Sequence, residues 1–295
     1  MRIGLFIDDR GTTLDEYLAA ARSAVDAGIQ ELWLGDRLAW DPLTLLAITG
    51  REIPGIRLGT AVLRTYPRHP IALADQALSV QAATGNRLVL GVGPSHEAII
   101  SGQYGYSFDK PARHVREYLE ALIPLLRGEN VAYQGSTLSA TGQVAVPGAS
   151  APPVLISALG PRMLRIAGEL TDGTITTWAG PKTLSSLIVP TITASGRSPE
   201  VIANLCVAVT PDPDSAREWL NSMYGAAMSL PSYRAIFDRE GVTSVGDTAI
   251  VGPESVVVAE IQRLFDAGAT GLLAVAIGSA EEQERTVSLL GSLTS

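Results

Sequence analysis

The feature that most constrains this chain is a repeated alternation of short apolar runs with helix-like stretches. Eight runs are candidate strands, at residues 3–7, 29–35, 56–63, 88–92, 154–157, 174–178, 202–209 and 272–277. The stretches between them include 70–84, 112–127, 161–170, 213–228 and 254–267. Strands that alternate with helices form a parallel sheet, because each helix returns the chain to the same edge. Eight such units can close into a (β/α)8 barrel.

Local signals at the two ends of the chain agree with this alternation. Thr13 and Glu16 form a capping box that predicts a helix after the first strand, and Gly28 predicts its end. The tripeptide Asp-Ala-Gly at 26–28 recurs at 266–268, again just before a strand. A doubly wound open sheet is the alternative, but no G-x-G-x-x-G follows the first strand, where a dinucleotide fold would place it.

We expect one TIM-barrel domain over residues 1–295. The length suits a single barrel with additions, and 46% hydrophobic against 18% charged residues suits strands buried on both faces. Two segments break the alternation. Residues 129–149 resemble a polar hairpin, and residues 229–253 hold prolines, aromatics and charges between two helices. Segments of this kind are commonly active-site loops or subunit contacts.

Charge and composition narrow the partners. A net charge of −8 disfavours nucleic acid, whose binding depends on clustered basic residues. The apolar runs are shorter than the roughly 20 residues of a membrane span, and Met1 leads directly into the first strand, so we expect no membrane segment and no signal peptide. Cys206 is the only cysteine, which fits a reducing cytoplasm. A small-molecule substrate is the expected partner.

Several chemistries do not fit the residues that follow the predicted strands. Lys110 and Lys182 are the only lysines, and neither falls on a strand as a Schiff-base aldolase needs. The three histidines lack paired zinc-ligand spacing, so no metal is expected. Ser95 lacks the glycine frame of a nucleophile elbow. A strand-end rim of glycines, few charges and an aromatic residue instead suits a bound cofactor that supplies the chemistry.

The clearest cofactor signal is the segment Ser157-Ala158-Leu159-Gly160-Pro161-Arg162, which joins a strand to a helix. Pro161 fits the first helical position, and free amides at the positive end of a helix bind phosphate. Arg162 and Arg165 add positive charge. An ordinary strand-to-helix turn is the alternative interpretation.

Other residues at predicted strand ends are candidates, each with a structural alternative. Gly93 and Pro94 in GVGPSHE would let a ring or phosphate approach the backbone, or serve packing alone. His96 is a candidate proton donor or a solvated histidine.

Asp36 could act as an acid or cap a helix, and Arg37 could bind an anion or form a surface ion pair. Asp8 also follows a strand. Trp178 could stack on a ring or belong to the core, and Cys206 fits a buried filler.

Five segments together resemble the bacterial-luciferase-like superfamily, particularly its coenzyme F420-dependent oxidoreductases. They are DAGIQELWLGD (26–36), IRLGTAV (56–62), YPRHPIALADQALSVQAATGNRLVLGVG (66–93), PPVLISALGPRMLRIAGELTDGTITTW (152–178) and DAGATGLLAV (266–275). The resemblance covers nearly the whole chain. It implies a barrel with the deazaflavin ring across the strand ends, its phosphate at Ala158–Gly160, and a bulge with a non-proline cis peptide at Thr60, Ala61 and Val62.

The chain departs from that family at two positions. The family often has Asp-His after the second strand, where this chain has Asp36-Arg37, and often has Glu where this chain has His96. We therefore predict an F420-dependent oxidoreductase that moves hydride to or from a small organic substrate, with Asp36 or His96 as the acid, acting as a cytoplasmic homodimer. An FMN-dependent luciferase-like monooxygenase and a non-catalytic deazaflavin-binding protein are the alternatives.

Overall fold

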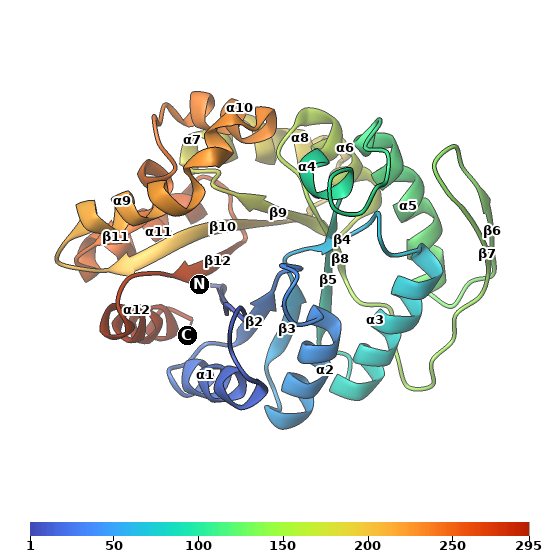
Figure 1. The fold of residues 1–295 in the computed structure, drawn as a ribbon, viewed down its shortest axis with the longest axis horizontal. Helices are drawn as coiled ribbons and strands as arrows, with labels where there is room; N and C mark the ends of the chain where they lie inside the picture. Colours follow the sequence, from blue (N-terminus) through green and yellow to red (C-terminus); the bar gives the residue numbers. More distant parts are fainter. Residues whose placement is uncertain (295) are drawn as a thin grey trace.

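The computed structural model describes residues 1–294 and shows a closed parallel barrel surrounded by helices (Figure 1). Its eight strands are β1 (Ile3–Phe6), β2 (Glu31–Leu34), β3 (Arg57–Thr60), β5 (Leu88–Gly93), β8 (Val154–Ser157), β9 (Gly173–Thr177), β10 (Glu200–Val209) and β12 (Gly271–Ala276). Each strand pairs in parallel with the next, and β12 pairs with β1, so that Ile3 lies opposite Leu272. The predicted (β/α)8 barrel is therefore confirmed.

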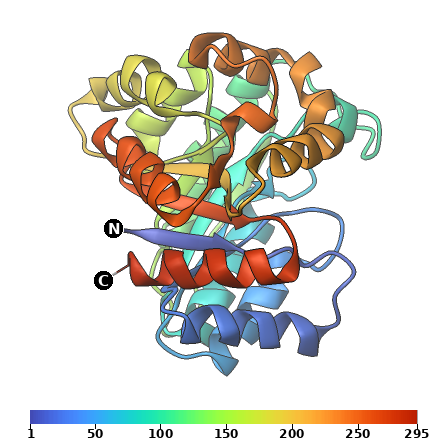
Figure 2. The same ribbon diagram turned by 90° about the vertical axis from the view of Figure 1, so that its left-hand side faces the viewer.

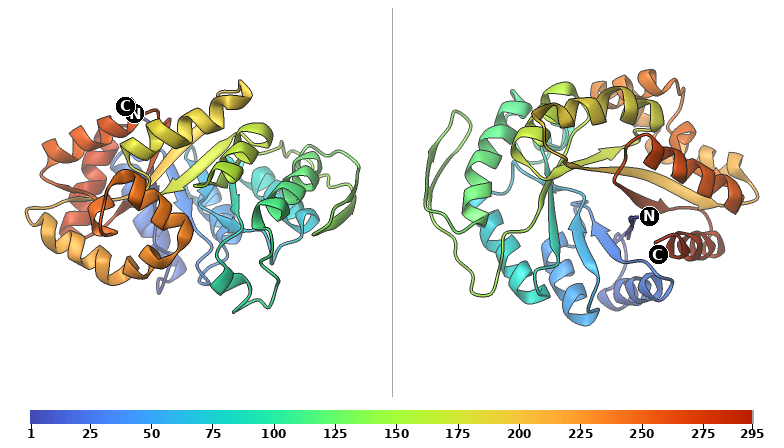
Figure 3. Two further views of the ribbon diagram at one scale, coloured as in Figure 1. Left: turned by 90° about the horizontal axis from the view of Figure 1, so that it is seen from above. Right: turned by 180° about the vertical axis from the view of Figure 1, so that it is seen from behind.

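The helices form an outer ring, seen from the opposite side in the right panel of Figure 3. Those that pack on the barrel are α1 (Leu14–Asp26), α2 (Pro42–Glu52), α3 (Pro70–Thr84), α5 (Pro111–Leu126), α6 (Pro161–Leu170), α11 (Glu254–Asp266) and α12 (Ala280–Ser292). Three short pieces, α7 (Pro181–Thr183), η1 (Leu184–Ile188) and α8 (Val189–Ile192), take the place of one long helix between β9 and β10. The capping box of Thr13 and Glu16 begins α1 as predicted.

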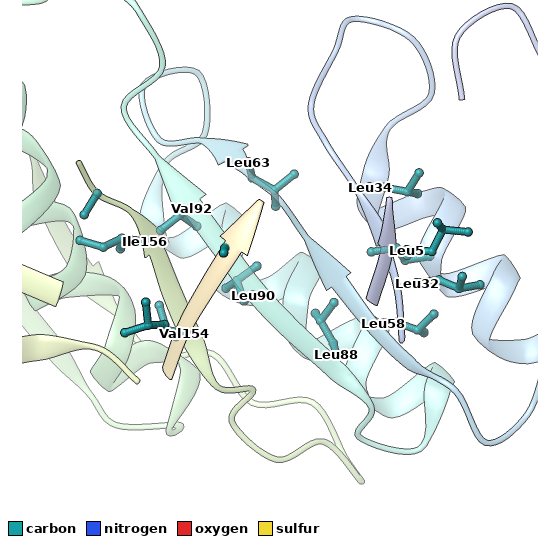
Figure 4. Close-up of a cluster of buried hydrophobic side chains, with 14 of the residues drawn as sticks. Leu5, Leu32, Leu34, Leu58, Leu63, Leu88, Leu90, Val92, Val154 and Ile156 are labelled. Atoms are coloured by element: carbon teal, nitrogen blue, oxygen red, sulfur yellow. The ribbon is translucent and has the colours of Figure 1, made fainter. Parts of the chain in front are cut away.

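The main core lies between the strands and this ring of helices. Alternate residues of a strand point to opposite faces, and Figure 4 shows Leu88, Leu90 and Val92 of β5 side by side with Val154 and Ile156 of β8. All five side chains are buried. Full burial of an aliphatic side chain contributes about 1.5–3 kcal/mol, so this outward-facing layer stabilises the barrel while leaving the strand ends free for a site.

Two segments lie outside the eight-unit repeat. Residues 129–149 contain an antiparallel hairpin of β6 (Val131–Gln134) and β7 (Ser139–Gly142), which extends past α5 in Figure 1. Residues 229–253 contain α10 (Pro231–Glu240), η4 (Gly246–Thr248) and a further parallel strand, β11 (Ile250–Gly252), which extends the sheet beside β10. The second segment is thus more regular than the loop-like composition suggested.

The two termini lie side by side (Figure 2). The amino group of Met1 donates a hydrogen bond to the backbone oxygen of Leu293 at 2.9 Å. Within residues 1–294, none of the helices combines the length and the apolar character that crossing a bilayer would require.

Candidate active site

The candidate site lies at the carboxyl ends of the barrel strands, above an apolar floor. Inside the barrel, buried side chains from β1, β2, β5, β8, β9, β10 and β12 form one cluster: Phe6, Trp33, Val89, Leu155, Ile175, Ile202 and Leu273. Ala61, Val62 and Val275 pack on this cluster and are partly exposed. The mouth of the barrel therefore offers an apolar surface to a bound ring.

A bulge after β3 shapes one side of this mouth. The Ala61–Val62 peptide is cis, and β4 (Leu63–Arg64) then resumes pairing with β5. Thr60 secures the bulge, because its hydroxyl donates to the Gly91 oxygen and accepts from the Gly91 amide, both at 2.8 Å. The Thr60 side chain is fully buried. This side chain therefore holds the backbone and leaves Ala61 and Val62 partly exposed at the mouth, while a contact of Thr60 with a cofactor stays a prediction.

Two glycines of β5 are required by the closeness of neighbouring groups. A Cβ at Gly91 would lie 1.9 Å from the backbone oxygen of Thr60, and one at Gly93 would lie 2.2 Å from the hydroxyl oxygen of Ser157. The glycines of the GVG motif therefore allow β3, β5 and β8 to meet at the mouth. Pro94, which follows them, is half-buried.

An ion pair lies beside the bulge. Arg64 Nη1 lies 2.7 Å from Asp36 Oδ1, and the two side chains are only 9% and 11% exposed. The same Nη1 lies 3.4 Å from the hydroxyl oxygen of Tyr104. Arg64 therefore forms an ion pair with the Asp36 carboxylate and fixes its orientation.

His96 lies on the same side of the mouth and contacts the inserted segment. Its Nε2 is 3.3 Å from the hydroxyl oxygen of Tyr233 on α10. Burial lowers the pKa of His96 below the ordinary value of 6.5, and the charge of Arg64 lowers it further. Burial also raises the pKa of Tyr233 to about 12. Near neutral pH the pair is therefore an uncharged imidazole and an uncharged phenol joined by a hydrogen bond.

Trp178, at the end of β9, lies in an aromatic cluster beneath the inserted segment. Its ring makes an edge contact with Tyr233 at a centroid distance of 4.8 Å and lies 5.9 Å from Phe237. Ala227 and Val245 complete the cluster, and Trp178 is buried. This side chain packs α10 against the end of β9, and its stacking on a coenzyme ring stays a prediction.

Asp8 and Arg37 lie across the barrel from β8. The Arg37 guanidinium stands 4.4 Å from the centroid of the Phe6 ring, and its Nη1 is 3.4 Å from Asp8 Oδ2. Partial burial by itself raises the pKa of Asp8, but hydrogen bonds from Arg10 and the charge of Arg37 lower it overall. Asp8 is therefore a carboxylate that holds the two arginines in place.

A cavity of about 1140 Å³ opens beside Asp8 and Arg37 and continues between α1 and α12. Cys206 lines it, and burial raises the pKa of this thiol to about 12. An un-ionised thiol is a weak nucleophile, which agrees with the predicted role of filler. Asp8 and Arg37 thus belong to one wall of a space large enough for a small molecule.

The predicted phosphate segment ends at Gly160, the residue that caps α6. Gly160 has ordinary extended dihedrals, φ −95° and ψ 155°, and no side chain among residues 1–294 caps the helix. A Cβ on Gly160 would meet no described heavy atom within 4 Å. Ser157 and Leu159 are half-buried, Ala158 is buried, and Pro161 is exposed. The free amides that open α6 therefore border open space, as an anion site requires.

The predicted residues fall into three groups around one mouth. Asp36 and His96 lie near Arg64 and the bulge. Asp8 and Arg37 lie together after the neighbouring strands β1 and β2. The segment 157–161 follows β8. The sequence analysis gave no role to Arg64, which follows a predicted strand, and missed Tyr104 and Tyr233. A basic residue directly after the predicted strand 56–63 was a usable signal for Arg64, whereas nothing in the sequence linked Tyr233 to His96 across 137 positions.

Within residues 1–294, no group of three or more His, Cys, Asp or Glu side chains is arranged to hold a metal ion. The fold and the mouth together define an α/β-barrel protein with an apolar, glycine-rich site at the strand ends. Comparison with known proteins identifies the family: the Luciferase-like monooxygenase profile matches residues 1–271, and the chain belongs to that family.

Named relatives and solved structures agree with this assignment. The 5,10-methylenetetrahydromethanopterin reductase of Methanolobus tindarius is 30% identical over 243 residues, which cover 79% of this chain and 73% of the relative. The coenzyme F420-dependent tetrahydromethanopterin reductase of Methanopyrus kandleri superposes with a TM-score of 0.82 at 23% identity, covering 98% and 97% of the two chains. An F420-dependent secondary alcohol dehydrogenase superposes with a TM-score of 0.82 at 16% identity, covering 100% and 99%. The two structural likenesses show the shared fold.

Proposed function

We propose that this chain is an oxidoreductase that exchanges hydride between coenzyme F420 and a small organic substrate. The observation that carries the proposal is an apolar mouth backed by the Ala61–Val62 bulge, in a chain 30% identical to a 5,10-methylenetetrahydromethanopterin reductase. Several relatives are named as F420-dependent, which supports F420 as the coenzyme.

The residues present fit this coenzyme. Ala61, Val62 and Gly93 would lie against its ring, and the amides after Gly160 would hold its phosphate. When bound, the coenzyme supplies a carbon centre that takes or gives hydride and reacts poorly with oxygen. The protein then has to orient the substrate, keep water away from the rings and move one proton.

His96 is the residue that we assign to the proton. As hydride leaves the carbon of an alcohol-type substrate, the proton of its oxygen needs a base, and a neutral imidazole is one. Burial and Arg64 keep the pKa of His96 low enough for this state at neutral pH. Tyr233 fixes the orientation of the imidazole through its hydroxyl group. In the reverse reaction, the imidazole of His96 returns the proton to the substrate oxygen.

Asp36 and Arg64 form the polar wall beside this base. Arg64 and Asp36 neutralise each other's charge. A polar group of the substrate beside His96 would therefore meet two oriented hydrogen-bonding side chains. Arg37 takes the position where the family often has histidine, and its charge suits a substrate that carries a polar or anionic group. As part of the same proposal, the enzyme acts in the cytoplasm as a homodimer, which size-exclusion chromatography with light scattering would test.

The second candidate is an FMN-dependent monooxygenase, which the description of the matching family favours. Titration of the purified protein with F420, FMN and NADPH separates the two, because each cofactor changes its fluorescence on binding. We expect binding of F420 and its anaerobic reduction by a panel of secondary alcohols. Tight binding of FMN alone would reject the proposal, and F420 binding without turnover across the panel would indicate a binding protein.

A further inference from the structure

A groove of about 760 Å³ lies between the start of α5 and the length of α6, and it is strongly basic. Its charged lining consists of five cations and one carboxylate: Lys110, Arg113, Arg116, Arg162, Arg165 and Glu169. Such a concentration is notable in a chain with 30 acidic and 22 basic residues. The groove is therefore a local reversal of the overall negative charge.

Most of this positive charge is not balanced within the chain. Arg116 forms an ion pair with Glu169 and lies 3.8 Å from Glu120. For Lys110, Arg113, Arg162 and Arg165, residues 1–294 provide no ion pair and no side-chain hydrogen bond. Cations grouped without counter-charges repel one another. An arrangement of this kind is stabilised when an anionic ligand occupies the groove.

The position of the groove indicates which ligand this is. Arg162 follows Gly160 by two residues, so the groove begins where the proposed phosphate site ends. Helices α5 and α6 pack side by side on the outside of the barrel (Figure 1). A chain that leaves a phosphate at Gly160 and runs outward would therefore pass along Arg162, Arg165 and Arg113. F420 continues from its phosphate into a chain of glutamate residues, whose carboxylates match this row of cations in charge.

We propose that the groove between α5 and α6 binds the polycarboxylate tail of F420 and makes this chain selective for long-tailed forms of the coenzyme. The inference rests on the proposed function, since it assigns a second part of the same ligand. Arg162 lies nearest the phosphate segment, and Arg113 and Arg165 supply charge farther along the tail. Ile166, the buried residue of the groove, lies against the apolar parts of the tail.

The test compares three forms of the coenzyme: F420 with several glutamates, F420 with none, and the deazaflavin that carries only its ribityl chain. Dissociation constants are measured by fluorescence for the wild type, for the double variant Arg113→Gln/Arg165→Gln and for Arg127→Gln. Arg127 is the matched control, because it is an exposed arginine at the opposite end of the same helix α5. All three proteins are measured at low and at high salt.

We expect the wild type at low salt to bind the long-tailed form about ten-fold more tightly than the form without glutamates, as two or three partly screened charge pairs provide. The double variant should lose this preference and keep the wild-type affinity for the ribityl form, and Arg127→Gln should behave as the wild type. High salt should remove the preference.

Each other outcome has a definite meaning. If the wild type binds all three forms equally, or if the double variant weakens the ribityl form to the same extent, the tail assignment is wrong while the proposed function stands. An equal loss of preference in Arg127→Gln would also overturn it. If none of the three forms binds, the proposed function itself fails, and the assignment of the groove fails with it.

Discussion

The two ends of the barrel both carry arginine and carboxylate side chains, but they use them differently. At the amino end of the strands, Arg2 and Arg57 alternate with Glu31 and Glu200. Arg2 lies 2.6 Å from Glu31 and 2.7 Å from Glu200, and Arg57 lies 3.3 and 3.4 Å from the same two residues. Two cations and two anions therefore form a closed ring with no net charge.

The Trp33 ring lies directly above this ion ring and separates it from the mouth. Its indole nitrogen donates to Glu31 at 3.2 Å, and a Cβ at Gly59 would lie 2.1 Å from its ring. At the carboxyl end, by contrast, Arg37 with Asp8 borders a cavity. Beyond that end, Arg162 and Arg165 of α6 have no ion-pair partner among residues 1–294. The balanced end stabilises the fold, and the unbalanced end is suited to bind a ligand.

The largest effect is expected where the mouth depends on its backbone. In Gly91→Ala the added methyl group would lie 1.9 Å from the Thr60 oxygen, in a place that is fully buried. We expect a loss of at least about 3 kcal/mol in the free energy of unfolding, together with loss of F420 binding, because strand β5 would have to move. Urea unfolding measures the first and fluorescence titration the second. A stable Gly91→Ala protein that binds F420 normally would contradict the described bulge.

The next largest effect is expected at the amino end of the strands, and it should change stability without changing binding. Glu31→Ala removes one of the two carboxylate partners of Arg2 and of Arg57, and the acceptor of the Trp33 indole, so we expect a loss of about 3 kcal/mol. Binding of F420 should stay within two-fold of the wild type, because Trp33 lies between the two ends. The exposed pair of Arg22 and Glu52 provides the control, and Glu52→Ala should cost less than about 0.5 kcal/mol. Weakened F420 binding in Glu31→Ala would show that the two ends are coupled.

At the carboxyl end of the strands, Gly160→Asp should weaken coenzyme binding without lowering the stability of the protein. Aspartate is a favourable N-cap residue, and the backbone at Gly160 and the open space around it accept a side chain. We therefore expect α6 to be as stable as in the wild type, or more so by up to about 1 kcal/mol. The carboxylate would repel a phosphate at the same amides, so affinity for F420 should fall about 30-fold, or about 2 kcal/mol. Gly160→Ala should bind normally, and normal binding by Gly160→Asp would exclude the phosphate site.

The fold was largely predictable because its signals are local and repeated. Apolar runs buried on both faces and capping pairs such as Thr13 with Glu16 act over a few residues, and each predicts its element without knowledge of the rest. The predicted strand 56–63 nevertheless proved to be two strands separated by the bulge at Ala61 and Val62. Family resemblance indicated that interruption, whereas composition could not, because the bulge depends on the hydroxyl of Thr60 meeting the backbone of Gly91.

The site was predictable only in part, since its geometry depends on contacts across the barrel. Strand-end position made Asp36 and His96 candidates but could not show that Arg64 pairs with the first and lowers the pKa of the second. Trp178 was named for its position at a strand end, yet its neighbours Tyr233 and Phe237 come from the inserted segment and bury it. Whether a strand-end aromatic faces a ligand or the core is decided by a segment far away in the sequence.

The smallest effects are expected from changes to proton transfer by His96, at the carboxyl end of the strands. When F420 is the hydride acceptor, His96 has to be neutral, and the neutral fraction rises as the pH rises through its pKa. Because that pKa lies below 6.5, kcat/KM should be constant from pH 7 to 8 and fall only in more acidic solution. His96→Gln should remove this fall of kcat/KM in acidic solution, which is called the acidic limb below.

Tyr233→Phe removes the hydrogen bond to His96 Nε2 but leaves the aromatic ring that packs on Trp178. We expect kcat to fall about five-fold, the order of one lost hydrogen bond. The acidic limb should stay where it is, because burial and the charge of Arg64 lower the pKa of His96, and Tyr233 is not among these causes. Tyr224→Phe changes another ring beside Trp178 and serves as the control. If Tyr233→Phe shifts the limb and leaves kcat unchanged, Tyr233 acts on the ionisation of His96, and the assignment of Tyr233 as the residue that orients the imidazole is wrong.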